Sequence, residues 1–193
     1  TGSMWGSETM DVRPDMLTCA KALSSAYLPI SAVLMSDRVY DTLASQAEAL
    51  GIFGHGYTYS AQPVCAAGAL RAQQLMQERD IIGNVQTLAP LFAERVSRMD
   101  RFSYIGHTRS IGMIGAMEFS SDPAQKTKFD AGHKIAAQAV AMIQEHGVIL
   151  RALPGDIIGF CPPLVMNESE MTDMFDRIDT AREAPPATAD SLR

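Results

Sequence analysis

Long apolar runs and an excess of positive charge are both missing from this sequence of 193 residues. No hydrophobic stretch reaches the roughly 20 residues that a membrane-spanning helix needs. The formal net charge is -6, whereas a nucleic-acid-binding domain normally carries a basic face. The sequence also begins without the charged and then apolar leader of a secretory signal. We therefore expect a cytoplasmic protein that binds neither a membrane nor nucleic acid.

Cysteine and histidine are sparse, and their spacing offers no metal site. The three cysteines, Cys19, Cys65 and Cys161, lie far apart in apolar surroundings, which favours buried free thiols over disulfides or metal ligands. The four histidines share no spacing with acidic residues that would form a zinc site. No G-x-S-x-G turn supplies a serine nucleophile. These absences argue against disulfide-stabilised, metal-dependent and serine-hydrolase classes.

Lysine is also scarce, and one of the four lysines stands apart from the others. Lys126, Lys128 and Lys134 crowd a single polar segment that is typical of a solvated surface. Lys21 instead follows the apolar run 16–19 and precedes small residues, where a buried strand would deliver it to a site. A lysine that loses solvation attacks a carbonyl as the free amine, which is Schiff-base chemistry. An isolated surface lysine is the simpler alternative.

Hydrophobic spacing predicts a layered α/β fold with two domains. Short apolar runs between turn residues indicate strands, and apolar residues that recur every three or four positions indicate helices. The expected buried strands are residues 16–19 and 30–34, and further short strands are expected at 105–109, 114–119, 148–150 and 157–160. The expected helices are a capped turn after Ser36, residues 63–79, 84–99 with a bend or restart at Pro90, 124–146, and a last helix between the capping box Asn167–Glu170 and Pro185. We place one domain at residues 1–98, a smaller one at 99–184, and a disordered tail at 185–193.

Three segments resemble, in the same order, motifs of the class III aminotransferases, the omega-transaminase family. Residues 13–30 resemble the segment that carries the pyridoxal-phosphate lysine, and they contain Lys21. Residues 55–63 match an H-G-x-T-Y-S-x-x-P pattern, and residues 147–164 match an R-x-x-x-x-D pattern followed by P-P-L. The resemblance runs over nearly the whole chain and is strongest to the omega-amino-acid:pyruvate branch. It implies an α/β fold of the fold-type I transferases.

The resemblance also implies a cofactor, a reaction and four site residues. Lys21 would form a Schiff base with pyridoxal 5′-phosphate and shuttle the proton between substrate and cofactor. Tyr57 and Thr58 would bind the cofactor, and Thr58 would do so in the neighbouring subunit of a homodimer. Arg151 would hold a substrate carboxylate through two parallel hydrogen bonds. The implied reaction moves an amino group from an amine or amino acid to a keto acid such as pyruvate.

Structural roles stay open for several of these residues. Thr58 could cap the helix that follows it, and Tyr57 could pack as an ordinary aromatic residue. Arg151 could pair with Asp156 at the surface. We give Arg109, at the edge of an expected strand, a mainly structural role.

The opening run, residues 1–6, resembles a T-G-x-M-x-G stretch that follows the first half of family members. The resemblance therefore implies a C-terminal piece, without the phosphate loop and the aspartate of the first half.

Two alternatives to an aminotransferase stay open. One is a related mutase or decarboxylase on the same scaffold. The other is a catalytically silent fragment, or a dimerisation module, that needs the remaining half. The amine donor and the keto acid are not set by the sequence.

Overall fold

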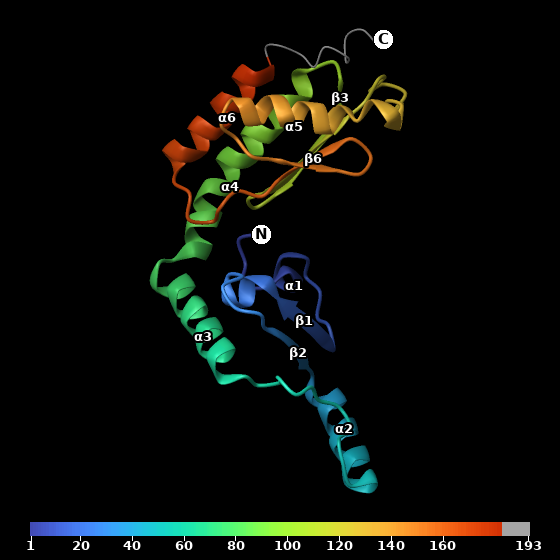
Figure 1. Cartoon of the computed structure of the whole chain (residues 1–193), viewed down its shortest axis with the longest axis vertical. Helices are drawn as coiled ribbons and strands as arrows, with labels where there is room; N and C mark the ends of the chain where they lie inside the picture. Colours follow the sequence, from blue (N-terminus) through green and yellow to red (C-terminus); the bar gives the residue numbers. More distant parts are fainter. Residues whose placement is uncertain (183–193) are drawn as a thin grey trace. The chain divides into compact units, whose positions relative to one another are not determined.

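The chain folds into two compact units. In the computed structural model, which describes residues 1–182, the first unit is Ser3–Asp80. The second unit consists of Thr1–Gly2 and the chain from Ile81 onward. Figure 1 shows the course of the chain through both. The compact units therefore divide between residues 80 and 81, and the domain boundary predicted between 98 and 99 stays a prediction. The assignment of a large and a small domain stays a prediction.

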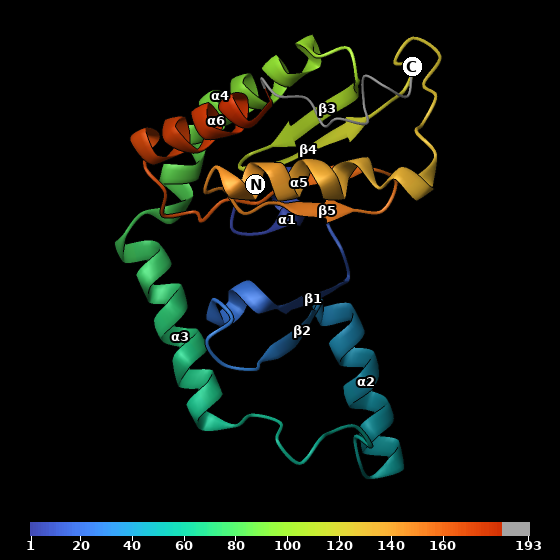
Figure 2. The ribbon, with the colours of Figure 1, turned by 45° about the horizontal axis from the view of Figure 1, so that its top comes forward.

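The first unit contains a strand pair and helices (Figure 2). Its elements are α1 (Gly6–Thr9), β1 (Met16–Ala20), the 3-10 turn η1 (Lys21–Ser24), β2 (Ser31–Met35), α2 (Asp37–Leu50) and α3 (Pro63–Glu78). β1 and β2 are antiparallel, with Met16 opposite Met35 and Ala20 opposite Ser31. The two strands lie where the sequence predicts them, and Lys21 comes directly after the first.

The prediction that these two strands are buried is wrong. Met16 and Val33 are 54% and 53% exposed, and every residue of β2 is exposed. A buried strand needs apolar layers on both faces of its sheet, and this unit provides no such layers. Its buried residues are Ser24, Ala69 and Ala72.

Residues suited to helix caps flank α2 and α3. Ser36 lies directly before α2, and Gly51, with a φ of +77°, lies directly after it. The predicted capped turn is therefore a helix of 14 residues. Pro63 takes the first position of α3. The N-cap of α3 is Gln62, whose Oε1 accepts a hydrogen bond from the Cys65 N–H at 2.7 Å. The predicted apolar face of α3 is confirmed by full or partial burial of Cys65, Ala69, Ala72 and Met76.

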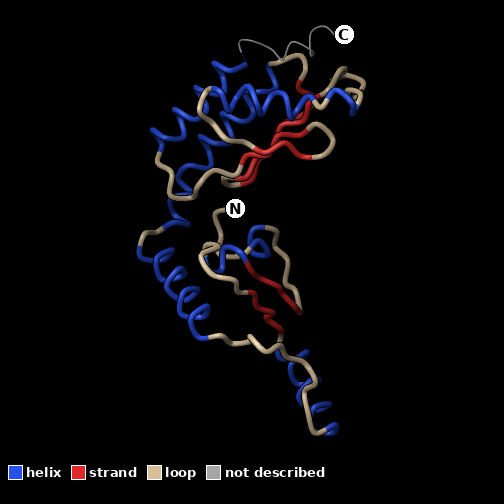
Figure 3. The backbone as a smooth tube through the Cα atoms, in the orientation of Figure 1, coloured by secondary structure: helices blue, strands red, loops and turns tan. Residues whose placement is uncertain are grey.

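The second unit is an antiparallel sheet packed against helices (Figure 3). The strand order is β3-β4-β6-β5. Its elements are α4 (Ile81–Ser97), η2 (Arg98–Arg101), β3 (Ile105–Ile111), β4 (Ile114–Phe119), η3 (Ala131–His133), α5 (Ile135–Glu145), β5 (Arg151–Leu153), β6 (Ile157–Phe160) and α6 (Glu168–Arg182).

The core of the second unit lies between one face of this sheet and the helices. Alternate residues of β4 and β6 are buried, as expected for a sheet with one covered face: Met117, Phe119, Ile158 and Phe160. The stripe predicted for α4 is confirmed, because all its members are buried in the same cluster: Val85, Leu88, Phe92 and Val96. This packing places α4 in the second unit, although the sequence assigned it to the first domain.

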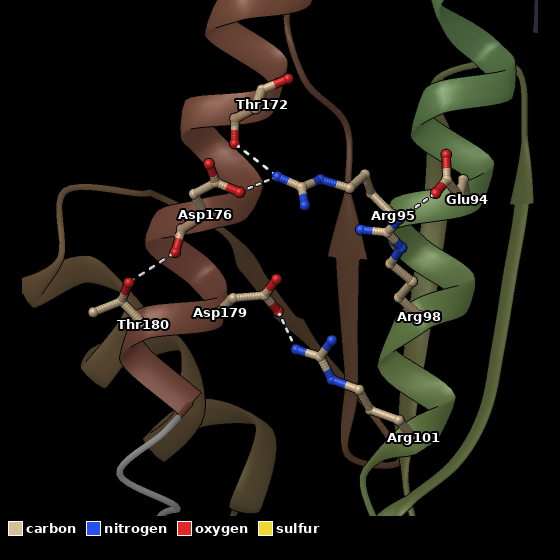
Figure 4. Close-up of polar contacts among 8 residues, drawn as sticks. All are labelled: Glu94, Arg95, Arg98, Arg101, Thr172, Asp176, Asp179 and Thr180. Carbon is tan, nitrogen blue, oxygen red and sulfur yellow. Dashed lines mark hydrogen bonds and ion pairs between the residues drawn. The ribbon is translucent and has the colours of Figure 1, made fainter.

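Arginine side chains join α4 and η2 to α6 (Figure 4). Arg95 keeps only 12% of its side chain exposed, donates to the Thr172 carbonyl at 3.1 Å and pairs with Asp176. Arg101 donates to a carboxylate oxygen of Asp179 at 3.1 Å. These polar contacts lie beside the apolar core and hold the two helical segments together.

The helical prediction between residues 84 and 146 needs two corrections. Of the bend or restart expected at Pro90, the restart does not occur, because the buried residues Leu88 and Phe92 anchor one helix on both sides of the exposed proline. The helix predicted for residues 124–146 begins only at Ile135, because Lys134 has a φ of +50°, outside the helical range.

One predicted strand is also displaced. The strand expected at residues 148–150 lies at 151–153, because the turn of residues 154–156 pairs Leu153 with Ile157. Gly147, with a φ of +85°, follows α5 and leads into an irregular segment in which Ile149 is 83% exposed.

The capping box before the last helix is confirmed. The Asn167 N–H donates to Glu170, and the Glu170 N–H donates to the Asn167 side chain, both at 2.9 Å. The helix stop expected at Pro185 and the disordered tail expected at 185–193 lie outside the described residues. Within residues 1–182, no helix has both the length and the apolar character that crossing a bilayer requires.

The cysteines are free thiols, as the sequence predicts. Their predicted burial is only partly correct, since Cys19 and Cys65 are partly buried and Cys161 is exposed. Cys19 lies on the open strand pair, which explains its partial exposure.

Candidate functional site

Lys21 is the first residue after β1 and the start of η1. Its φ of +52° is left-handed, and its carbonyl accepts a hydrogen bond from the Ala26 N–H at 3.0 Å, which closes the turn. The Lys21 side chain is exposed in the described chain, whereas the sequence analysis expected it to lose solvation. The cause is that the first unit provides no layer over the strand pair.

The loop after Lys21 is fixed on α3. Ser24 is buried, and its hydroxyl donates to the Leu28 carbonyl at 2.6 Å. Gln73 donates from α3 to the Leu23 carbonyl at 2.9 Å. A Cβ on Gly68 would lie 2.5 Å from a Leu28 methyl carbon, so a larger residue there would require the Leu28 side chain to move. The sequence did not single out these contacts; the small residues along α3 were the available signal.

Tyr57 and Thr58 lie in a tight turn between α2 and α3. The Tyr57 N–H donates to the Ser60 hydroxyl at 3.1 Å, and the Ser60 N–H donates to the Tyr57 carbonyl at 2.9 Å. The rings of His55 and Tyr57 meet edge to face with centroids 5.4 Å apart. Both Tyr57 and Thr58 have exposed side chains. Thr58 does not cap α3, because Gln62 takes that position.

No hydrogen bond, ion pair or ring contact within residues 1–182 joins Lys21 to Tyr57 or Thr58. A role for Thr58 in a neighbouring subunit would need no such contact, and that role stays a prediction.

Arg151 is the first residue of β5, in the second unit, opposite Gly159 of β6. It is exposed and forms no ion pair within the described chain. The alternative in which Arg151 pairs with Asp156 is not seen in the described chain, where the Asp156 carboxylate instead accepts the Ala136 N–H at 3.1 Å. Arg151 lines a groove of about 1050 Å³. The apolar side chains of this groove include Leu150, Phe160, Val165, Met166 and Met174.

A second arginine lines the same groove but is engaged. The Arg177 Nε donates to Asp173 at 2.7 Å, and this hydrogen bond raises the pKa of the Arg177 guanidinium. Of these two arginines, Arg151 is therefore the one available for an external carboxylate. Arg109 instead lies 3.5 Å from Glu118 on the neighbouring strand, which fits its structural role.

Comparisons with known proteins agree with the motifs. The family model of aminotransferase class III matches residues 1–181. An uncharacterized aminotransferase, y4uB, of Sinorhizobium fredii is 37% identical over 183 residues, which cover 94% of this chain and 39% of that protein. A probable mitochondrial gamma-aminobutyrate transaminase 3 of Oryza sativa subsp. indica is 36% identical, with coverage of 95% and 36%.

Solved structures give the same result. An aminotransferase from Vibrio fluvialis in its PMP-bound form superposes with a TM-score of 0.92 at 34% identity, covering 97% of this chain and 42% of that one. A PLP-bound mutant from the same organism gives a TM-score of 0.90 at 33% identity, covering 95% and 40%.

The chain therefore belongs to the class III aminotransferases, and the predicted family and fold-type I class are confirmed. It spans about two-fifths of the length of the relatives that it matches.

Proposed function

We propose that this chain provides the lysine, the phosphate-binding turn and the carboxylate-binding arginine of a pyridoxal-phosphate-dependent aminotransferase. The observation that carries the proposal is Lys21, which extends from a loop fixed on α3 inside a segment typical of the family. The PLP-bound and PMP-bound Vibrio fluvialis structures support the cofactor. The expected reaction transfers an amino group from an amine or amino acid to a keto acid such as pyruvate.

The side chains that the cofactor and substrate need are available in the described chain. Lys21, Thr58 and Arg151 are exposed, and none of them has a polar side-chain partner within residues 1–182. A primary amine, a hydroxyl donor and a guanidinium suit an aldehyde, a phosphate and a carboxylate respectively. The donor set therefore fits pyridoxal phosphate and a carboxylate substrate.

Each residue then has a defined task. Bound pyridoxal phosphate supplies an aldehyde carbon and an electron-withdrawing ring. The Lys21 Nζ would hold that carbon and, once free, would take up and return a proton. The Thr58 hydroxyl donates to the phosphate, and Tyr57 lines the cofactor site. Arg151 binds the carboxylate by two parallel hydrogen bonds and swings away when the substrate is an uncharged amine.

Labelling with sodium borohydride tests the role of Lys21. We would join this chain to the part of the Vibrio fluvialis aminotransferase outside the matched region, and call the product the chimeric enzyme. Borohydride should fix pyridoxal phosphate to Lys21, and Lys21→Ala should abolish the label, as read by peptide mass spectrometry. Lys134→Ala, which removes a lysine of the other group, is the matched control and should keep it. A label on any other lysine would refute the assignment.

Product analysis separates transamination from its rivals on the same scaffold. With an amine donor and pyruvate, an aminotransferase yields alanine, whereas a mutase or a decarboxylase does not. Formation of carbon dioxide or of a rearranged amine without alanine would favour the rivals.

A second candidate is a chain that is silent without additional polypeptide. Two observations favour this candidate: both strands of the first unit are exposed, and the chain matches only about two-fifths of the length of its relatives. The isolated chain should then bind pyridoxal phosphate weakly, as measured by its absorbance change, while the chimeric enzyme binds it tightly. Stoichiometric binding by the isolated chain would contradict this candidate.

We further propose a homodimer in which Thr58 serves the partner's cofactor. The exposed ring cluster around Tyr57 supports an interface there, since Tyr57 is 77% and Tyr59 85% exposed. Mixing Lys21→Ala with Thr58→Ala chimeric enzyme should restore activity, because one site of each hybrid dimer keeps both residues. Failure of hybrids to regain activity would place both residues in one subunit.

We place the protein in the cytoplasm, although the rice relative is described as mitochondrial.

A further inference from the structure

The tip of the β5–β6 hairpin is anchored through one residue, Asp156. Its Oδ1 accepts a hydrogen bond from the Ala136 N–H in the first turn of α5 at 3.1 Å. Its carbonyl accepts another from the Phe119 N–H at the end of β4 at 3.0 Å. One residue therefore ties the tip both to a helix and to a different strand of the sheet.

The backbone at this tip suits aspartate. Gly155 and Asp156 have φ values of +84° and +55°, in the left-handed region. Aspartate and asparagine enter that region more readily than other side chains. The negative charge also lies at the N-terminus of α5, where the helix dipole favours it. Asp156 thus satisfies the turn, the helix end and the strand contact together.

Apart from this anchor and its packing on α5, β5 has few partners. It has three residues and lies at the edge of the sheet, bonded to β6 alone among the described strands. Leu153 packs over Gly159, where an added Cβ would lie 3.2 Å from the Leu153 Cδ1. Arg151 pairs with the same Gly159, so a shift of the hairpin tip changes the position of Arg151.

We propose that Asp156 is a positioning residue for Arg151: it fixes the hairpin tip, and thereby sets where the guanidinium meets a substrate carboxylate. This inference rests on the carboxylate-binding role of Arg151 in the proposed function. In this proposal Asp156 acts through the hairpin and not through contact with the substrate.

Amide hydrogen exchange on the 193-residue chain tests the anchor without any activity. Asp156→Gly keeps the left-handed backbone but removes the acceptor, and should speed exchange at Ala136 and along β5 by at least about tenfold. Asp156→Asn keeps an acceptor and should stay close to the parent chain. Asp130→Ala is the matched control, because it removes a similar side-chain acceptor, for the Gly132 N–H at 2.8 Å, outside the hairpin. It should leave β5 unchanged.

Kinetics of the chimeric enzyme test the consequence for Arg151. Asp156→Gly should raise KM for pyruvate on the order of tenfold and leave KM for butanal, an acceptor without a carboxylate, unchanged. In an Arg151→Ala background, Asp156→Gly should have no further effect on pyruvate. Asp156→Asn should restore the pyruvate KM.

Two results would overturn the inference. One is exchange in β5 that Asp156→Gly leaves as in the parent chain, and the other is an equal rise of KM for pyruvate and butanal. If the unsubstituted chimeric enzyme does not transaminate, or does not prefer carboxylate substrates, the proposed function is wrong. The hydrogen-exchange result then still shows whether Asp156 anchors β5.

Discussion

At the scale of single residues, buried aromatic side chains form part of the core of the second unit. Phe92 is fully buried, and its ring meets that of Phe175 edge to face with centroids 5.7 Å apart. Gly115 leaves room for it, since an added Cβ would lie 3.0 Å from the Phe92 ring.

Phe92→Ala should lower the free energy of unfolding of the chain by about 3–5 kcal/mol, because it removes buried area and leaves a cavity. Chemical denaturation measures the change. Ile149→Ala, at a position 83% exposed, is the control and should change stability by less than about 0.5 kcal/mol. Equal losses in the two variants would show that the core assignment is wrong.

At the scale of elements, Arg95 joins α4 to α6 by packing more than by charge. Its guanidinium lies 5.8 Å from the centroid of the Phe175 ring, and its Nε has no partner within residues 1–182. Asp176, its ion-pair partner, keeps 60% of its side chain exposed. An exposed ion pair contributes little, whereas a buried stem and a charged hydrogen bond to a carbonyl contribute more.

Arg95→Ala should therefore cost about 1–3 kcal/mol of unfolding free energy, and Asp176→Ala less than about 1 kcal/mol. Arg95→Met keeps the stem and removes the unsatisfied Nε–H, so its loss should lie below that of Arg95→Ala. Arg98→Ala is the control, because that side chain is 53% exposed. Equal losses at Arg95 and Asp176 would favour charge pairing over packing.

The elements predicted correctly from the sequence are those with local signals. Pro63 starts α3, the stripe through Phe92 defines α4, and Asn167 caps α6, and each signal lies within a few residues of its effect. The displacement of β5 and the exposure of Lys21 had no such signal. Strand pairing depends on the turn at Asp156 and on distant β6, and burial depends on which layers cover a sheet.

The candidate site was predictable as motifs but not as geometry. The positions of Lys21, Thr58 and Arg151 came from family patterns, while the contacts that hold them came only from the fold. Gln73 and Asp156 act through hydrogen bonds to residues 50 and 20 positions away, a separation that no local pattern reveals.

At the scale of the whole molecule, the two units differ in what holds them together. The second unit has a contiguous buried cluster that draws on its helices and strands. The first unit buries few residues and exposes large apolar side chains from Met4 to Leu70. A unit of this size with so little buried area cannot offset the entropy of ordering its backbone.

A polypeptide of residues 81–193 should therefore unfold cooperatively on heating, as followed by circular dichroism and near-ultraviolet signals. A polypeptide of residues 3–80 should show no cooperative transition and little amide chemical-shift dispersion. Cooperative unfolding of residues 3–80 alone would contradict this division of stability.

The open strand pair also affects the solubility of the polypeptide in a cell. Each of the two strands bonds only to the other in the described chain, so each has an outer row of peptide groups beside exposed apolar side chains. Such a row is a template for further strands, and natural proteins usually shield it. Synthesised by itself, this polypeptide should accumulate in inclusion bodies or be retained by chaperones. Co-expression with the part of the Vibrio fluvialis aminotransferase outside the matched region should release it as soluble protein.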